Sequence, residues 1–594
     1  MIRSIGTDGG VSHGETGPDQ HARGIQAPLI NTATASFMFP ALTAGQIARI
    51  VAHGVLRPIT CGEVLIESGQ QDVPFFFVKA GKIEVIRPSA LEDLLIAIVR
   101  ADQFTGDISM ILGRPALMRL RVSESGEVIQ LTHDQMHTLI RSDAEMSEVL
   151  MKALIYRRVE MVARGIGDVL LIGSAHSAAT FRIKVFLTRN GHPFKYLDIE
   201  RDADVRDLLD RFGVDHGELP VLICRGGAVL KNPANQEIAE CLGFNARIDQ
   251  AHERDVVIVG AGPAGLAAAV YAASEGLDAL VIEASSPGGQ AGSSSKIENY
   301  LGFPTGISGQ ELAERAYAQA QKFGASIMIA KGAAELTCEA ECYGVRLCDG
   351  ATISARTVII ATGARYRKPP LVNLAEFEGA GVYYNATFME DALLGDGDEV
   401  IVVGGANSAG QAAVFLARAG RRVHVLVRSD SLSESMSRYL VSRIEETPTI
   451  QVRTRTEIVA LEGNGHLERV LWRDSTGAVT SHDVRHVFLM TGAEACTAWL
   501  NGRITLDSKG FIKTGPDLTP EDLAAAQWPL DRSPYLLETS RPGVFAVGDV
   551  RCGNVKRVAS AVGEGSIAIS FVHRLLAELG PSALAPSWPP VVSA

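Results

Sequence analysis

Residues 255–283 have the composition and spacing of a binding site for a dinucleotide pyrophosphate. Four apolar residues, 256–259, predict a short buried strand, and the small residues after them predict a tight turn into a helix. Glycines there allow backbone N–H groups to approach phosphates at the positive end of the helix. Glu283 follows roughly 20 residues after the turn, where an acidic side chain meets a ribose hydroxyl. We therefore predict an ADP-containing cofactor, with a purely structural turn as the alternative. The predicted contacts in the turn are Gly260, Gly262, Pro263, Ala264 and Gly265.

A second unit of the same βαβ type begins with the strand 399–403 and ends with the strand 422–427. Its turn uses alanine at two of the glycine positions, which still keeps side-chain volume low beside a pyrophosphate. The second strand ends on a base, Arg428, which can pair with a 2′-phosphate, whereas an acid would select the free ribose. NADPH is therefore favoured over NADH, which stays the alternative. The predicted contacts are Gly404, Asn407, Ser408, Ala409 and Arg428.

The elements that position these motifs belong to a chain of 594 residues, long enough for roughly four domains. Hydrophobic residues make up 46% and charged residues 21%, which is typical of a globular protein. The net charge of −12 disfavours nucleic acid and anionic membranes as partners. No apolar run approaches the roughly 20 residues of a membrane helix, and residues 1–26 lack a signal core. The eight cysteines contain no Cys-x-x-Cys pair. We expect a cytoplasmic protein with no metal site.

Residues 37–165 read as a small β-roll between helices, with a helix over 46–53, β-hairpins in 74–100 around Ala80-Gly81, and a long amphipathic helix from Asp143. This segment resembles the cyclic nucleotide-binding domain family, in which a Phe-Gly-Glu and Arg-Ser/Thr-Ala cassette holds the ribose and the cyclic phosphate. Here Asp107 replaces the glutamate, and Pro115 follows Arg114 in place of the hydroxyl residue. Proline removes a hydroxyl and a backbone N–H. A vestigial or protein-contact module is favoured, and a cyclic nucleotide stays the alternative ligand.

Residues 166–247 alternate strands and helices: a strand over 169–173, helices over 180–190 and 205–212, and an apolar strand directly after Pro220. This order resembles the thioredoxin or glutaredoxin fold, whose proline is usually cis. The redox cysteines of that family are absent, because the chain reads Ser174-Ala175-His176-Ser177 at their place. Thiol exchange needs a low-pKa thiolate at a helix start. We therefore interpret this segment as a docking or spacer domain.

The region from about residue 254 to 571 resembles the low-molecular-weight thioredoxin reductases and their wider flavoprotein family. The resemblance rests on the first glycine motif, on Gly288-Gly289-Gln290, and on the segments 297–300, 358–363 and 544–550. It implies bound FAD, with Gln290 and Asn299 along the flavin and Asp549 at the ribityl chain. The residues it adds as cofactor contacts are Gly289, Gln290, Asn299, Thr362, Gly363, Gly548, Asp549, Arg557 and Val558.

One motif of that family is missing. Thioredoxin reductases carry Cys-Ala-Thr-Cys in the nicotinamide domain, and this chain reads Asn385-Ala386-Thr387-Phe388 there. Asparagine and phenylalanine cannot carry electron pairs, so no catalytic side chain is predicted. Phe388 is either a cap on the flavin face or packing.

The predicted fold class is α/β: two Rossmann-like domains of thioredoxin reductase type, preceded by a β-roll cyclic nucleotide-binding-like domain and a thioredoxin-like domain. The expected ranges are a flexible leader (1–36), the β-roll domain (37–165), the thioredoxin/glutaredoxin-like domain (166–247), the FAD-binding domain (253–375 and 500–580), the NAD(P)H-binding domain (385–495) and a tail (581–594).

The predicted function is an FAD-dependent oxidoreductase that takes hydride from NAD(P)H and passes electrons to an unidentified acceptor. One alternative is a sensory or regulatory flavoprotein whose front domains bind a partner or a nucleotide. Another is a thioredoxin-disulfide reductase that acts with a partner's thiols. The family resemblance implies a homodimer.

Overall fold

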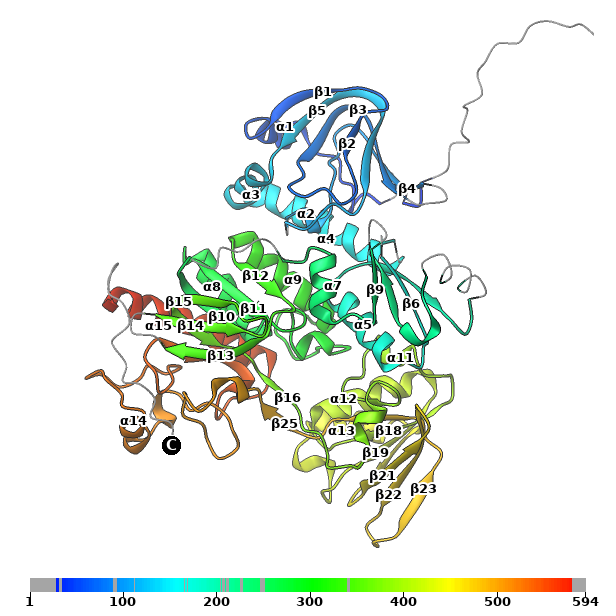
Figure 1. The fold of residues 1–594 in the computed structure, drawn as a ribbon, viewed down its shortest axis with the longest axis vertical. Coiled ribbons are helices and arrows are strands. Elements are labelled where there is room, and N and C mark those ends of the chain that lie inside the picture. Colours follow the sequence, from blue (N-terminus) through cyan, green and yellow to red (C-terminus); the bar gives the residue numbers. More distant parts are fainter. Residues whose placement is uncertain are drawn as a thin grey trace, which may run out of the picture.

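The chain forms four modules around a central junction in a computed structural model (Figure 1). The structure describes residues 28–30, 35–88, 93–111, 113–164, 166–167, 169–202, 205, 209, 213–224, 228–245, 252–338 and 342–579. The β-roll module lies at the top of the view, above the thioredoxin-like module and the first Rossmann module. The second Rossmann module lies at the bottom and joins the first through β16 (Ala364–Tyr366) and β25 (Ala493–Ala495). Within the described ranges, no helix is long and apolar enough to cross a bilayer.

The β-roll module is a five-stranded sheet of order β1-β5-β3-β4, with β2 paired to β5. Its elements are α1 (Ala44–Val51), β1 (Val55–Ile59), β2 (Val64–Ile66), β3 (Phe75–Arg87), β4 (Leu94–Val99), α2 (Ile108–Ile111), β5 (Arg119–Leu131), α3 (His133–Ser142) and α4 (Ala144–Ala163). The predicted hairpin at Ala80-Gly81 is wrong, because β3 continues through this dipeptide with shifts in its register to β5. A Cβ atom on Gly81 would lie 2.5 Å from the Glu124 carbonyl oxygen, so this glycine permits a bulge rather than a turn.

The long helix predicted from Asp143 is α4, whose first turn is capped by the Asp143 carboxylate at 3.0 Å from the Met146 N–H. Its buried positions recur every three or four residues, as expected of an amphipathic helix. Two arginines, Arg157 and Arg158, lie on this buried face and are only 5% and 6% exposed. Buried charges need partners, so this helix carries polar contacts as well as packing.

The thioredoxin-like module has a four-stranded sheet of order β7-β6-β8-β9, in which β6 and β7 are parallel and β8 and β9 run antiparallel to their neighbours. Its elements are β6 (Val169–Gly173), α5 (Ala178–Arg189), β7 (Phe194–Asp198), β8 (Val221–Ile223), β9 (Val229–Lys231) and α7 (Asn235–Cys241). The Leu219–Pro220 bond is cis. Cys224 and Cys241 form a disulfide, a pairing that the cysteine spacing did not indicate. The predicted helix over 205–212 falls largely outside the described residues.

The first Rossmann module has the sheet order β12-β11-β10-β15-β14-β13, with β26 paired to β15. Strands β10, β11, β12, β15 and β26 are parallel, so their carboxyl ends meet at one edge. Its elements are β10 (Arg254–Val259), α8 (Pro263–Ser274), β11 (Ala279–Glu283), α9 (Gly309–Phe323), β12 (Ser326–Ile329), β13 (Ala333–Cys338), β14 (Tyr343–Leu347), β15 (Thr352–Ile360), α14 (Pro520–Ala525), β26 (Val544–Ala546) and α15 (Val558–Leu579).

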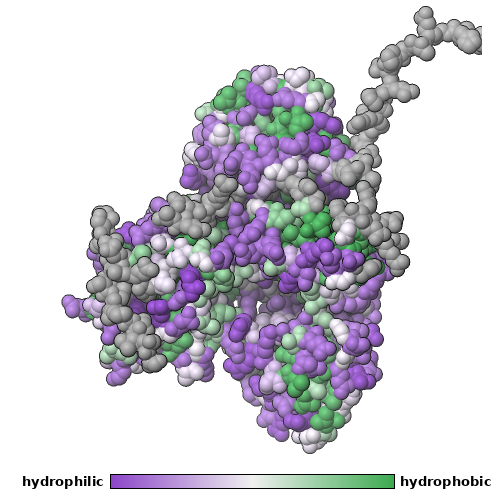
Figure 2. All heavy atoms as spheres, in the orientation of Figure 1, coloured by the Kyte–Doolittle hydropathy of each residue, from purple (hydrophilic) through white to green (hydrophobic). Residues whose placement is uncertain are grey.

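The second Rossmann module has an all-parallel sheet of order β17-β24-β18-β19-β20 beside an antiparallel sheet β21-β22-β23. Its elements are α10 (Leu374–Phe377), β17 (Val382–Tyr383), α11 (Phe388–Asp391), β18 (Glu399–Val403), α12 (Asn407–Leu416), β19 (Arg422–Leu426), α13 (Arg438–Glu445), β20 (Ile450–Arg453), β21 (Glu457–Gly463), β22 (Leu467–Arg473), β23 (Val479–His482) and β24 (His486–Leu489). The predicted fold class is confirmed. Figure 2 shows a largely hydrophilic surface that is hollowed between the two Rossmann modules.

Candidate cofactor site

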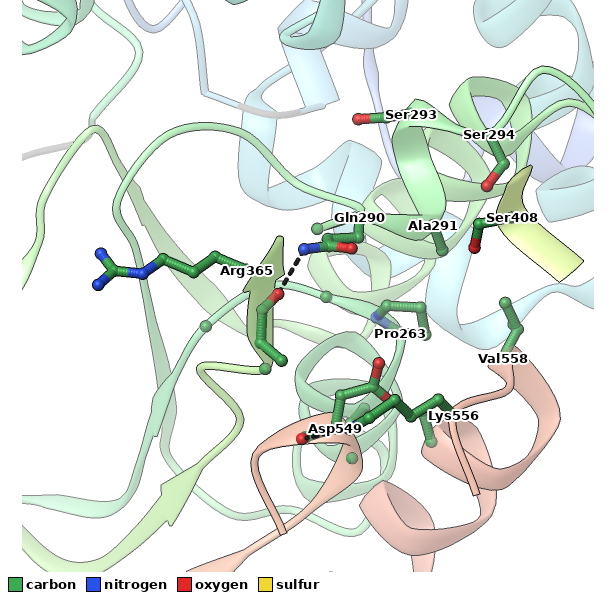
Figure 3. A pocket seen from close by; sticks show the side chains of 18 of the residues that line it. Pro263, Gln290, Ala291, Ser293, Ser294, Arg365, Ser408, Asp549, Lys556 and Val558 are labelled. Atoms are coloured by element: carbon green, nitrogen blue, oxygen red, sulfur yellow. Dashed lines mark hydrogen bonds between the residues drawn. The ribbon is translucent and has the colours of Figure 1, made fainter. Parts of the chain in front are cut away.

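A cavity of about 590 Å³ lies at the carboxyl edge of the first Rossmann sheet and extends to the second module (Figure 3). It draws together segments from Arg189 to Ala561, which are 372 residues apart in the chain. Most of the contacts predicted from the sequence line it. These are Gly260, Gly262, Pro263, Ala264, Glu283, Gly289, Gln290, Asn299, Thr362, Gly363, Asn407, Ser408, Gly548, Asp549, Arg557 and Val558.

The glycine turn leaves room for a ligand. A Cβ atom on Gly289 would lie 3.0 Å from the Cα atom of Gly262, so the two residues face each other across a narrow cradle. Gly260 has φ +108°, and a Cβ atom there would lie 2.4 Å from the Ala361 carbonyl oxygen. Gly265 does not line the cavity: its Cβ would lie 1.8 Å from the Gly260 carbonyl oxygen, so it serves the packing of helix on strand. This cradle fits a pyrophosphate beside the first turn of α8.

Glu283 lies at the end of β11 with its carboxylate in the cavity wall. It accepts N–H bonds from Ala261 at 2.8 Å, Ser285 at 2.8 Å and Ser286 at 3.2 Å. Burial raises the pKa of this carboxyl, and the N–H groups oppose that shift. These bonds fix the Glu283 carboxylate in the cavity wall beside the glycine turn.

The far end of the cavity carries Asp549, Lys556 and Gln290, all labelled in Figure 3. The Lys556 ammonium donates to the Asp549 carbonyl oxygen at 3.2 Å. Burial raises the pKa of the Asp549 carboxyl, and Lys556 opposes the shift. The Gln290 amide donates to the Ala364 carbonyl oxygen across the cavity wall. Polar groups therefore line this end opposite the start of α15.

Basic side chains outnumber acidic ones around the cavity. The acids are Glu283 and Asp549. The bases are Arg189, Lys296, Arg365, Lys368, Lys556 and Arg557. This excess of positive charge in a concave site favours a ligand with several phosphates, so the residues present fit FAD and a nicotinamide dinucleotide.

The second Rossmann module reaches the cavity through the start of α12. Asn407 and Ser408 line it, and the Tyr366 hydroxyl pairs with the Ser408 side chain. Gly404 has φ +141° and forms the turn, while Ala409 is buried behind it. Neither lines the cavity, and Arg428 is exposed at the end of β19. The structure therefore does not bring Gly404, Ala409 and Arg428 into the shared cavity.

The segment in place of the redox cysteines also reaches this cavity, since Tyr384 and Asn385 line it. The Tyr384 hydroxyl donates to Glu378. The Phe388 side chain lies outside the described residues. None of the described cysteines lines the cavity. Cys496 touches its wall through its backbone, and burial raises the pKa of its thiol, which disfavours a reactive thiolate.

The β-roll module holds a second cavity, of about 60 Å³, lined mainly by apolar side chains. Ligand pockets for drug-sized molecules are about 300–1,000 Å³. Arg157 closes the cavity: its Nε donates to the Met38 carbonyl at 2.8 Å and its Nη1 to the Gly106 carbonyl at 2.7 Å. Burial lowers the pKa of Arg157 to about 9.

Arg114, the base kept from the phosphate cassette, does not line this cavity. Its Nη1 donates to the Asn190 carbonyl at 3.1 Å, and its Nη2 to the Tyr317 hydroxyl at 3.3 Å. The guanidinium also lies 4.6 Å from the centre of the Phe244 ring. It therefore holds the β-roll module against the thioredoxin-like and first Rossmann modules.

The thioredoxin-like module has no thiol at its expected active position, residues 174–177. Ser174 donates to Glu200 at 2.7 Å, and Ser177 caps the start of α5. His176 is 72% exposed in its side chain, and its ring lies 6.3 Å from that of His466 in the second Rossmann module. Residues 174–177 of the thioredoxin-like module therefore lie on the side that faces the second Rossmann module.

Several polar lining residues were not predicted from the sequence, among them Arg189, Tyr366, Gln411 and Lys556. Gln411 lies one turn after Asn407 on α12, and Lys556 directly precedes the predicted Arg557, so helical spacing and proximity could have found them. Arg189 belongs to the thioredoxin-like module, and no motif connects it to a cofactor.

Comparisons with known proteins found matches for the two Rossmann modules and for the β-roll module. The model of the pyridine nucleotide-disulphide oxidoreductase family matches residues 254–565, and that of the cyclic nucleotide-binding domain matches residues 56–143. Thioredoxin reductase of Bacillus subtilis (strain 168) is 33% identical over 327 residues, which cover 55% of this chain and 95% of the relative. Thioredoxin reductase of Ureaplasma parvum serovar 3 is 33% identical, with 54% and 96% covered. The structure of Lactococcus lactis thioredoxin reductase in its FR conformation covers 55% of this chain and 100% of its own, at 27% identity and a TM-score of 0.48.

Proposed function

This chain belongs to the pyridine nucleotide-disulphide oxidoreductase family, and we propose that its flavin delivers electrons directly to an acceptor from outside the chain. It is an NAD(P)H-dependent oxidoreductase of thioredoxin reductase type, with FAD and NADPH as its cofactors. When bound, FAD accepts a hydride from the nicotinamide and passes two electrons to the acceptor. The acceptors we propose are a quinone, oxygen, a small redox protein or an external disulfide.

The observation that carries the proposal is the lining of the shared cavity. Asn385 stands in the cavity wall, at the position where the family resemblance leads us to expect a cysteine, and no described cysteine lines the cavity. Cys496, whose backbone carbonyl accepts a hydrogen bond from the lining residue Thr362, has a thiol pKa that burial raises. A disulfide relay inside the chain needs a thiolate at the flavin, so direct transfer is the route that these residues support.

The chain's own residues bind and align the reactants rather than exchange protons. The glycine cradle and Glu283 hold the ADP half, and the bases around the cavity balance the phosphates. We propose that Asn407 and Ser408 place the second nucleotide at the positive end of α12, fixed by the Tyr366 hydroxyl. Arg428 would then meet the 2′-phosphate outside the shared cavity.

The test is anaerobic stopped-flow reduction of the flavin by NADPH and by NADH, followed by turnover with ferricyanide, a quinone, oxygen, and thioredoxin with its disulfide indicator. We expect reduction by NADPH and turnover that survives alkylation of the reduced protein with iodoacetamide. Failure of both nucleotides to reduce the flavin would refute the oxidoreductase assignment. Turnover that alkylation abolishes would instead refute direct transfer and show that a thiol is required.

We also propose a homodimer, as in the related reductases. An apolar groove of about 450 Å³ on α8, α9 and the start of α15 supports it, together with Leu301, which is 94% exposed, and Tyr271, which is 44% exposed. Burying such side chains is favourable by about 25 cal/mol per Å² of apolar surface. Light scattering of the purified protein measures the mass directly. Location in the cytoplasm stays a prediction.

A further inference from the structure

The end of helix α5 in the thioredoxin-like module lies against the cofactor turn of the first Rossmann module. The Arg189 guanidinium donates through Nη2 to the Gly289 carbonyl at 2.6 Å. The next residue, Asn190, donates its amide to the Ser285 carbonyl at 3.4 Å. Gln310 on α9 approaches the carbonyls of the same helix end, with its Nε2 at 3.3 Å from the Thr188 oxygen. The end of α5 therefore contacts both the loop that follows Glu283 and the start of helix α9.

Arg189 contributes a positively charged side chain to the wall of the cofactor cavity. It lines the cavity together with Glu283 and Gly289. Its Nε is buried without a hydrogen-bond partner among the described residues. The nearby carboxylates of Glu283 and Glu390 partly offset the cost of burying its charge. The part of this cation that lines the cavity is available to a ligand, so an anionic group there would be bound favourably.

The position of Arg189 identifies the part of the cofactor it faces. Gly289 forms one wall of the pyrophosphate cradle, and Glu283 marks the ribose of the ADP half. The segment between them, residues 284–288, contains no basic residue. Arg189 therefore supplies the positive charge that this side of the cradle lacks, in the planar geometry that suits phosphate oxygens.

Two further arginines hold this helix end in place. Arg114 of the β-roll module donates to the Asn190 carbonyl, and Arg158 on α4 donates through Nε to the Gly191 carbonyl at 2.6 Å. Both are buried. Asn190 and Gly191, which follow Arg189, are thus each held by an arginine of the β-roll module. This makes Arg114 a positioning residue for Arg189.

We propose that Arg189 of the thioredoxin-like module is a binding residue for the ADP half of FAD, so that the front of the chain completes the cofactor site. The inference rests on FAD being the cofactor but not on the acceptor or on turnover. Because Arg189 comes from outside the two Rossmann modules, cofactor retention depends on the docking of the front modules.

The experiment measures FAD binding to the full-length protein without NADPH or acceptor. Apoprotein of the wild type and of Arg189→Met, Arg189→Lys and Arg201→Met is titrated with FAD, followed by flavin fluorescence, and with ADP as competitor. Arg201 is an exposed arginine of the same module and serves as the matched control. We expect Arg189→Met to raise the dissociation constants of FAD and ADP about 10- to 100-fold, as for loss of a charged hydrogen bond. Arg189→Lys should recover part of the loss, and Arg201→Met should behave as wild type.

A purely structural role gives a different result. If Arg189 only ties the helix end to Gly289, Arg189→Met lowers the melting temperature of the apoprotein but keeps the increase in melting temperature that saturating FAD produces. We expect the opposite, a reduced increase on adding FAD. Unchanged FAD and ADP affinities in Arg189→Met would overturn the proposal. They would leave the direct-transfer function untouched, because no electron transfer is measured.

Discussion

The β-roll module should bind neither cyclic AMP nor cyclic GMP in the micromolar range, even though its sequence matches the cyclic nucleotide-binding family. The cassette base, Arg114, is committed elsewhere, to the Asn190 carbonyl, the Tyr317 hydroxyl and the Phe244 ring. A cyclic phosphate would have to recruit this guanidinium back into the roll. It would therefore compete with contacts that hold three modules together.

The size of that competition follows from the contacts. A hydrogen bond to a charged group contributes about 1.5–3 kcal/mol and a cation–π contact about 0.5–2 kcal/mol. Taking the low end of each for two hydrogen bonds and one ring contact gives about 3.5 kcal/mol, or roughly a 400-fold weaker apparent affinity. An intrinsic dissociation constant of about 1 μM would become about 0.4 mM. The small roll cavity and the proline after Arg114 add to this cost.

Isothermal titration with each nucleotide, on the wild type and on Arg114→Met, is the assay. No saturable heat is expected below about 100 μM ligand for either protein, given the affinity above. Micromolar binding by the wild type that disappears in Arg114→Met would refute the reasoning, because it would mean that the arginine turns inward readily. Micromolar binding that persists in Arg114→Met would show a site that does not use the cassette.

Two other predictions concern the second Rossmann module. Arg428→Ala should raise KM for NADPH about 10-fold and leave KM for NADH unchanged, since one charge–phosphate contact is lost. The control is Arg422→Ala, because Arg422 is an exposed base on β19. Equal effects of Arg428→Ala on both nucleotides would contradict the assignment. His486 has a pKa lowered by burial from 6.5 to about 4. The unfolded state takes up the proton near pH 6.5, and the folded state only near pH 4. This histidine should therefore lower the free energy of unfolding by about 3 kcal/mol as the pH falls from 6.5 to 4, with no loss above pH 6.5. Thermal unfolding of His486→Gln between pH 7 and 4 should show a weaker loss than wild type, with the exposed His466→Gln as control; parallel curves would contradict the burial argument.

The sequence predicted the Rossmann units well because their signals are local. The strand, turn and helix of 255–283 lie within one short stretch, and Gly265 is required by the Gly260 carbonyl of the same unit, although Gly260 itself is required by the more distant Ala361 carbonyl. The dipeptide Ala80-Gly81 was misread because a glycine can mark a turn or a bulge. What decides between them is the partner strand β5, more than 40 residues away, which the dipeptide does not reveal. The Cys224–Cys241 disulfide likewise joins two elements whose contact is tertiary.

The residues of the candidate site were likewise predicted where their signal is local and missed where it depends on tertiary contacts. Contacts in the two glycine turns were predicted from their spacing and the remaining flavin contacts from the family resemblance, and most of them line the cavity. Arg189 carried no signal, because an arginine at the end of an amphipathic helix ordinarily caps its C-terminal carbonyls. Its role depends on how a separate module docks. Arg114 kept its cassette position but not its direction, since orientation is decided by the packing partners Phe244 and Tyr317.

The front modules are better understood through their contacts than through the ligands of related folds. Helix α5 is 12 residues long, about 18 Å. Its first turn meets the second Rossmann module, where the Phe181 and Tyr383 rings lie 5.8 Å apart and Ala178 packs against Gly379. Its last turn meets the first Rossmann module at Gly289. A helix that spans both cofactor-binding modules needs a capped start and a charged end, which Ser177 and Arg189 provide. The absence of thiols at residues 174–177 removes nothing from that role, because a serine can cap a helix although it cannot carry out thiol–disulfide exchange.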